Sequence, residues 1–228
     1  MYYGIDDRVR YCIAGKRVVL LDIERNRFFG LPKNAEAAFL RMIDQNGELT
    51  GTELGDLGFL RERYYIVERD YPIPVARGLM ADTPTANYRN SATGNNPFSA
   101  KLAAIGWQIY AAATLRFRRF SSLVDNVQRT ARGQSPGFED SAANEKRVVE
   151  EAVAAFASVD FLFGRTNRCL VRSVAMVLML RAKGIPVHLV FGVRTEPFAA
   201  HCWAQLESVV LNDQFDHVRT FTPILCVG

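Results

Sequence analysis

The chain has 228 residues, of which 49% are hydrophobic, 23% charged and 11% aromatic. These proportions are typical of a folded globular protein, and they exclude long disorder, a collagen repeat and a disulfide-rich miniprotein. The net charge is only +4, and the excess lies in residues 101–132, which hold six basic side chains and one acidic side chain. Residues 1–76 carry a net charge of −1, a poor electrostatic footprint for nucleic acid, so we expect no nucleic-acid partner.

Targeting and redox signals predict a cytoplasmic protein. The segment MYYGIDDRVR has two aspartates and lacks the apolar core of a signal peptide. The apolar stretch Leu102–Leu115 is too short to cross a bilayer, so we expect no membrane association. The four cysteines have no CxxC spacing, which predicts reduced thiols and no metal site.

The first seventy or so residues predict a small unit of three strands and two helices. Two strands flank the turn Ala14-Gly15-Lys16, and a third strand ends before Pro32. A helix follows and closes at Asn46-Gly47, after which Thr50 or Thr52 can cap a second helix. The order β-β-β-α-α has winged-helix proportions. The strands are expected at Val9–Ile13, Arg17–Ile23 and Arg27–Leu31.

The middle of the chain separates this unit from the rest. Residues 77–99 are rich in Pro, Asn, Gly, Ser and Thr without periodicity, which predicts a linker between domains at 1–76 and 100–228. A basic segment at residues 116–120 is expected to form a solvated face, with docking to a partner, peptide contact and attraction to an anionic membrane as open alternatives. Helices are predicted at Lys101–Phe120, Ser121–Ala131 and Ser141–Ala157.

The final third of the chain predicts a buried helix packed on an antiparallel sheet. Residues 169–183 are apolar on nearly all sides, and Gly184 followed by Pro186 is a clear stop signal. Together with the N-terminal unit, this pattern predicts an α+β fold. The strands are expected at Val187–Arg194, His201–Glu207 and Val209–Asp213.

Three residues in this region form a candidate catalytic set. Cys169 begins the buried helix, where unpaired backbone N–H groups and the helix dipole favour a thiolate. His201 begins a strand, and an odd loop such as Leu206-Glu207-Ser208 would turn Asp213 toward the same face. A carboxylate there would orient the imidazole, and the imidazole would activate the thiol. The alternative is a buried structural cysteine and a hydrogen-bonded structural histidine.

The other histidines and cysteines have no matched base and carboxylate in the sequence. We therefore expect structural roles for them, and Cys202 in particular alternates away from His201 toward the core. The residues in question are Cys12, His188, Cys202, His217 and Cys226.

These patterns resemble the lasso-peptide biosynthesis B proteins. The region NRCLVRSVAMVLMLRAKGIPVHLVFGVRTEPFAAHCWAQLESVVLND resembles their transglutaminase-like, papain-like cysteine protease domain. It shares a cysteine at a helix start, a GIP-to-GVR strand, a PFxxHxW segment and a terminal VxND. The stretch RYCIAGKRVVLLDIERNRFFGL resembles the PqqD-like leader-recognition element that some members carry in the same chain. Residues 77–140 add almost nothing to the likeness, and Glu207-Ser208 stands where relatives often have Gly.

The resemblance implies a leader peptidase. Such proteins bind a ribosomal precursor through its leader and cut the leader from the core, and a separate asparagine-synthetase-like cyclase then closes a macrolactam ring. It implies that Cys169 is the nucleophile, His201 the base and later the acid, and Asp213 the orienting carboxylate. No Gly-rich phosphate loop is visible, so we expect no intrinsic cofactor and assign any ATP requirement to the cyclase.

The N-terminal unit is expected to select the substrate. A free strand edge could accept the leader as an added strand, with one of two neighbouring phenylalanines reaching the groove or both simply packing. Two other functions stay open: an acyltransferase of transglutaminase type that uses the same triad, and a scaffold that presents the peptide without hydrolysing it. The expected leader-binding residues are Arg27, Phe28, Phe29, Gly30 and Leu31.

Overall fold

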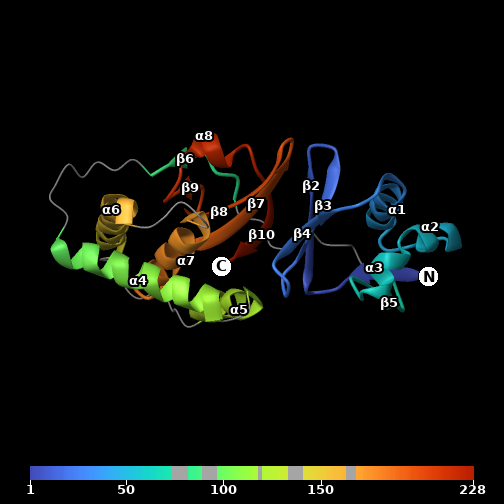
Figure 1. The fold of residues 1–228 in the computed structure, drawn as a ribbon, viewed down its shortest axis with the longest axis horizontal. Coiled ribbons are helices and arrows are strands. Elements are labelled where there is room, and N and C mark those ends of the chain that lie inside the picture. The colour runs from blue at the N-terminus through green and yellow to red at the C-terminus, as the bar shows by residue number, and fades with distance from the viewer. Residues whose placement is uncertain (73–81, 89–96, 118–119, 133–140, 163–167) are drawn as a thin grey trace.

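The computed structural model describes residues 1–72, 82–88, 97–117, 120–132, 141–162 and 168–228. The expected break at 133–137, Arg118, Arg119 and much of the segment 77–99 lie outside these residues. Helices and strands mix throughout, as the α+β prediction required (Figure 1). In the orientation of Figure 1, the N-terminal strands and helices lie at one end and the helices α4–α7 at the other.

The three predicted N-terminal strands are present and form an antiparallel sheet in the order β2-β3-β4. Thr50 is the N-cap of α2, and Glu53 completes a capping box with it. The structure adds a third short helix and a strand pair, β1 with β5, so the unit is richer than β-β-β-α-α. Its likeness to a winged helix stays a prediction. The bounds are β1 (Tyr2–Ile5), β2 (Val9–Ala14), β3 (Arg17–Asp22), β4 (Arg27–Gly30), α1 (Lys33–Asp44), α2 (Gly51–Asp56), α3 (Gly58–Glu62) and β5 (Ile66–Arg69).

The second sheet has the order β10-β7-β8-β9-β6, and α7 packs against β7 and β8 on one face of it (Figure 1). Gly184, at a φ of +87°, follows α7 in the left-handed conformation that the stop signal predicted. Helix α4 packs against both α6 and α7. The bounds are β6 (Ala86–Asn87), α4 (Phe98–Phe117), α5 (Phe120–Arg132), α6 (Ser141–Val159), the 3-10 turn η1 (Asp160–Leu162), α7 (Arg168–Arg181), β7 (His188–Thr195), β8 (Phe198–Leu206), β9 (Val209–Val210), α8 (Phe215–Val218) and β10 (Thr222–Val227).

Part of the segment predicted as a linker runs along this sheet. Residues 82–88 carry β6, which pairs parallel with β9 at the sheet edge. The Gln205 side chain donates to the Asp82 carbonyl at 2.6 Å and to the Glu207 carbonyl at 2.7 Å. These bonds attach residues 82–88 to the C-terminal sheet, so this part of the predicted linker belongs to that sheet.

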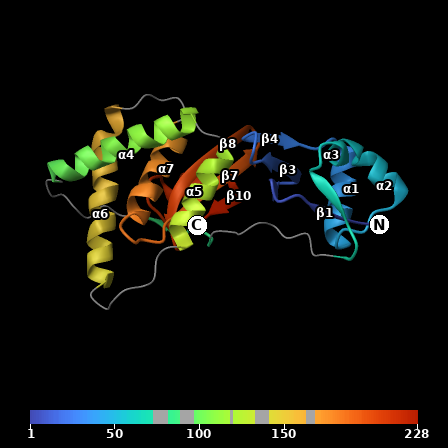
Figure 2. The same cartoon turned by 90° about the horizontal axis from the view of Figure 1, so that it is seen from below.

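The sheet β2-β3-β4 is buried on both faces. Alternate residues of β3 point to opposite sides, so Leu20 enters the N-terminal core with α1 while Leu21 enters the core that holds α7 and β7. The Thr195 hydroxyl at the end of β7 donates to the Ala14 carbonyl at 3.4 Å. Figure 2 shows the same arrangement, with β3 and β4 between the N-terminal helices and the strands β7 and β8. The N-terminal sheet and the C-terminal unit therefore share one apolar core.

Helix α4 has large apolar side chains on its outer face. Its buried positions are small or polar, such as Ala104 and Gln108, whereas Ile109 and Phe117 are exposed. No described helix combines the length and apolar character needed to cross a membrane.

The shared core generates a stability prediction. Replacing the fully buried Leu21 with Ala should lower the free energy of unfolding by about 2–5 kcal/mol, because it leaves a cavity between the two sheets. The measurement is urea denaturation followed by tryptophan fluorescence, since both Trp107 and Trp203 lie in the C-terminal unit. Leu102→Ala, at an exposed site, is the control and should change stability by less than about 0.5 kcal/mol. An unchanged tryptophan transition in Leu21→Ala would contradict a shared core.

Candidate active site

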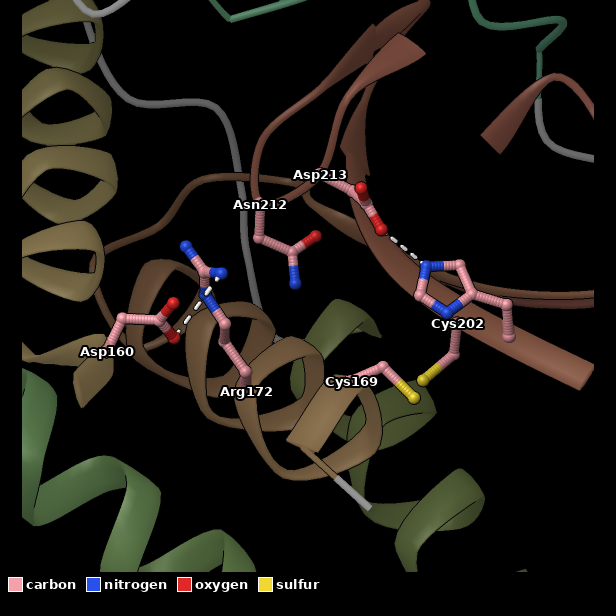
Figure 3. Close-up of a pocket in the computed structure, with 7 residues that line it drawn as sticks. Asp160, Cys169, Arg172, Cys202, Asn212 and Asp213 are labelled. Atoms are coloured by element: carbon pink, nitrogen blue, oxygen red, sulfur yellow. Dashed lines mark hydrogen bonds and ion pairs between the residues drawn. The ribbon is translucent and has the colours of Figure 1, made fainter. Parts of the chain in front are cut away.

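Three residues expected to act together line one cavity. Cys169, His201 and Asp213 surround a space of about 240 Å³ between the start of α7 and the strand β8. Figure 3 shows this cavity, with Asp213 above it and Cys169 on the helix below. The remaining lining residues are Asp160, Arg172, Cys202 and Asn212.

Cys169 is the second residue of α7, where the helix dipole favours a negative charge. Hydrogen bonds from Cys202 and from His201 lower the pKa of its thiol from 9.0 to about 4, against the opposing effect of partial burial. The sulfur is therefore a thiolate at neutral pH, which is the nucleophilic form of cysteine.

His201 connects the thiolate to a carboxylate. Its Nε2 donates to Asp213 Oδ2 at 2.5 Å, which leaves Nδ1 for the sulfur. Burial lowers the pKa of His201, but the hydrogen bonds with Asp213 and Cys169 outweigh it and raise the pKa to about 9. Burial raises the pKa of Asp213, and the bonds from His201 and from the Gln214 N–H outweigh it and lower the pKa to about 2. At neutral pH the site therefore holds a thiolate, an imidazolium and a carboxylate in series.

The predicted route by which Asp213 reaches His201 is wrong. Leu206 pairs with Val209, so the turn has two residues, not the three of an odd loop. Continued pairing in this register would place Asp213 opposite Cys202, on the face away from His201. The strand ends at Val210 instead of extending to Asp213, and the departing chain swings the carboxylate across to the imidazole.

A hydrogen-bonded brace sets the distance between the helix and the strand. The amide of Asn212 donates to the Ser173 hydroxyl at 2.7 Å, and its oxygen accepts from the Ala204 N–H at 2.8 Å. Ser173, one helical turn after Cys169, donates in turn to the Cys202 carbonyl at 3.1 Å. The brace joins α7, β8 and the segment that carries Asp213, so it positions all three catalytic candidates.

Aromatic rings form the wall behind the imidazole. The His201 ring lies 5.2 Å from the Phe221 ring and 6.2 Å from the Trp203 ring, between ring centres. Gly192 is the cross-strand partner of His201, and a Cβ on it would lie within 3.0 Å of both aromatic side chains. The glycine of the GVR segment therefore makes room for the rings that confine His201.

A second histidine contacts the carboxylate. His217 on α8 lies 3.1 Å from Asp213 Oδ2, and its ring centre is 4.7 Å from that of His201. In the described part of the chain, these three residues offer ligand atoms within 4.8 Å of one another, a set that could hold a metal ion. The same atoms hydrogen-bond to each other, so a metal there would compete with the bond between His201 and Asp213.

Comparison with known proteins identifies the family of the domain that contains this cavity. The family model described as the transglutaminase-like superfamily matches residues 111–226, just over half of the chain. The chain belongs to the transglutaminase-like superfamily. The matched segment includes every residue that lines the cavity, whereas the N-terminal unit lies outside it.

A relative of the chain has a more specific description. The Microcin J25-processing protein McjB of Escherichia coli is 33% identical over 70 residues. The match covers 31% of this chain and 34% of that protein, so the chain spans about a third of the curated relative. No solved structure matches the chain significantly.

The expected leader-binding residues lie on and after β4, outside the superfamily domain. Phe29 stacks on Tyr65 with ring centres 5.4 Å apart, and Phe28 packs against the shared core. Leu31 is almost fully buried, so its side chain is covered by the N-terminal core. Arg27 and Gly30 are exposed.

The structure brings to the candidate site residues that the sequence did not mark as functional. Cys202 and His217 were expected to be structural, and both contact the candidate triad. Arg172 lies 3.5 Å from Asp160 at the far side of the cavity. Asn212 carried a signal in the VxND segment, but only the tertiary structure shows that it braces the helix.

The brace generates the next prediction. Ser173→Ala should lower the free energy of unfolding by about 1–3 kcal/mol, because it leaves the Asn212 amide and the Cys202 carbonyl without their partner. It should also slow alkylation of Cys169 by iodoacetamide, since the helix is no longer held against β8. Urea denaturation and mass spectrometry of the Cys169 peptide measure the two effects. Ser158→Ala on α6, whose hydroxyl donates within its own helix, is the control; equal effects in both variants would argue against the brace.

Proposed function

We propose that this protein is a leader peptidase of lasso-peptide biosynthesis. It would bind a ribosomal precursor through its leader and hydrolyse the amide bond between leader and core. The observation that carries the proposal is the cavity in which the Cys169 thiolate, His201 and Asp213 meet. The membership of the transglutaminase-like superfamily and the similarity to a microcin-processing protein support the same activity.

The proposed reaction uses the charges already present in the site. The Cys169 thiolate attacks the scissile carbonyl, and the oxyanion that forms is stabilised by the Cys169 backbone N–H at the start of α7. The His201 imidazolium donates its proton to the departing amine, which becomes the N-terminus of the core. Neutral His201 then takes a proton from water, which attacks the thioester and releases the leader as a carboxylic acid. Asp213 keeps the ring oriented throughout.

Leader binding is proposed at the free edge of β4. This strand pairs with β3 on one side and is the last strand of its sheet among the described residues. An extended leader could pair with the Arg27–Gly30 backbone, because an unpaired strand edge offers N–H and carbonyl groups in register. The half-buried Phe28 and Phe29 flank this edge on opposite faces of the sheet.

The product defines the next partner. Cleavage releases a new α-amine, and ring closure joins this amine to a side-chain carboxylate that must first be activated. We propose that a separate ATP-consuming, asparagine-synthetase-like cyclase performs that step and that this chain needs no cofactor of its own. An acyltransferase reading retains support from the superfamily, since the same acyl-enzyme could react with an amine in place of water.

Substitution of the nucleophile tests the activity. Cys169→Ala should abolish cleavage of a precursor peptide, because it removes the thiolate that forms the acyl-enzyme, and the neighbouring Cys202 is buried and keeps its proton. Mass spectrometry of the wild-type reaction should show two unmodified fragments whose masses sum to the precursor plus one water. Cys226→Ala, a buried cysteine away from the cavity, is the control and should cleave normally.

The other outcomes separate the alternatives. A cross-linked product with an added amine would indicate acyl transfer in place of hydrolysis. Unchanged processing by Cys169→Ala would overturn the nucleophile and favour a peptide-binding scaffold.

Hydrogen exchange tests the leader site. Adding a synthetic leader peptide should slow exchange of the Arg27–Gly30 amides, because strand pairing would engage those that face the free edge. A peptide with the same composition in scrambled order is the control. Protection confined to other parts of the chain would place the leader elsewhere.

A further inference from the structure

Cys202 lies against the nucleophile. It follows His201 in β8 and points to the opposite face of the strand, toward α7. Figure 3 shows its sulfur next to that of Cys169, and both residues line the cavity. Only 3% of the Cys202 surface is exposed, whereas Cys169 is partly exposed. The site therefore contains two sulfurs in contact, of which one is enclosed by protein.

The brace fixes the backbone around Cys202. The Ser173 hydroxyl donates to the carbonyl of Cys202 itself, and the Asn212 side chain holds the N–H of Ala204. Ser173 lies on the same helix as Cys169, so one set of bonds controls the position of both sulfurs. The contact between them follows from this framework and from the register of β8.

The two sulfurs differ in protonation. Contact with the Cys169 thiolate, together with burial, raises the pKa of Cys202 well above its ordinary value, so this residue keeps its proton. A protonated thiol beside a thiolate can act as a hydrogen-bond donor to it.

We propose that Cys202 is a positioning residue for the nucleophile: its S–H donates a hydrogen bond to the Cys169 sulfur and directs that sulfur toward His201. The thiolate then has donors on two sides, the Cys202 thiol and the His201 ring. This inference deepens the proposed cysteine mechanism and rests on Cys169 being the nucleophile. The other charged groups that face the cavity are Asp160, Arg172 and Asp213.

The test measures the ionisation of Cys169 without any peptide substrate. The full chain is treated with iodoacetamide across a range of acidic pH, and the rate of alkylation is followed by mass spectrometry of the Cys169 peptide. Only the thiolate reacts, so the rate should fall as the pH drops through the pKa of about 4. Circular dichroism at each pH confirms that the chain is folded.

Two variants isolate the donor. Cys202→Val fills the site but cannot donate, and it should raise the midpoint by about one pH unit, which slows alkylation about tenfold at pH values below the midpoint. Cys202→Ser restores a donor and should keep the midpoint near that of the wild type. Cys226→Ser, a cysteine outside the cavity, is the matched control and should not move the midpoint. Cys202→Ala replaces the valine variant if that one does not fold.

Each outcome bears on the inference. A midpoint that is equal in Cys202→Val and the wild type would overturn it, as would equal shifts in the valine and serine variants. A wild-type midpoint near 9 would mean that Cys169 is protonated at neutral pH, and this result would contradict the proposed thiolate nucleophile. If the wild-type midpoint is low and shifts in Cys202→Val, but the wild-type protein does not cleave the precursor, the role of Cys202 is supported and only the proposed substrate is wrong.

Discussion

The hydrogen bonds between Asn212, Ser173 and β8 are the constraint on which the site depends. A helix and a sheet packed through apolar side chains can slide by small amounts, because dispersion contacts have little directional preference. The brace removes this freedom at one point, one turn after Cys169 and at the residue before Asp213. Because Ser173 is fully buried, breaking the brace would leave polar groups without hydrogen-bond partners. That free-energy cost fixes the position of α7 relative to β8.

Within this framework, the charges stabilise one another. The thiolate of Cys169, the imidazolium of His201 and the carboxylate of Asp213 alternate in sign along a short chain of contacts. Partial burial makes each isolated charge unfavourable, so each depends on its neighbour: the pKa values of Cys169 and Asp213 fall, and that of His201 rises. Cys202, the proposed hydrogen-bond donor, lies against the same sulfur and is almost fully buried. The cavity lies on the open side, where a peptide carbonyl could approach.

The N-terminal sheet contributes to this architecture through its second face. Leu21 and its neighbours on that face complete a core that also holds α7 and β7, while the opposite face packs on the N-terminal helices. A peptide that paired with β4 would therefore contact a strand whose sheet is continuous in packing with the C-terminal unit. Phe28 of β4 packs against the same core as α7, the helix that carries Cys169.

Local signals in the sequence predicted the elements well because they are local. Gly184, Thr50 and the apolar run of α7 each specify a helix boundary or a buried face from neighbouring residues alone. The same signals placed Cys169 at a helix start and His201 on the same strand face as Trp203, which the stacking of their rings confirms. The pattern of β3 also predicted a strand. It did not show which of the two apolar faces of that strand enters which core.

What the sequence by itself determined is the longer helices, the strands β2–β4, β7 and β8, and the candidate thiol, imidazole and carboxylate. Only the tertiary structure decided how they meet. Asp213 reaches His201 because β9 ends at Val210. Cys202 reaches Cys169 because α7 packs on the face of β8 to which Cys202 points, opposite the face of His201. The contact between Asp213 and His201 depends on where a strand ends, and the contact between Cys202 and Cys169 depends on where a helix packs on the sheet. Such features are set by packing and by buried hydrogen bonds, not by the order of neighbouring residues.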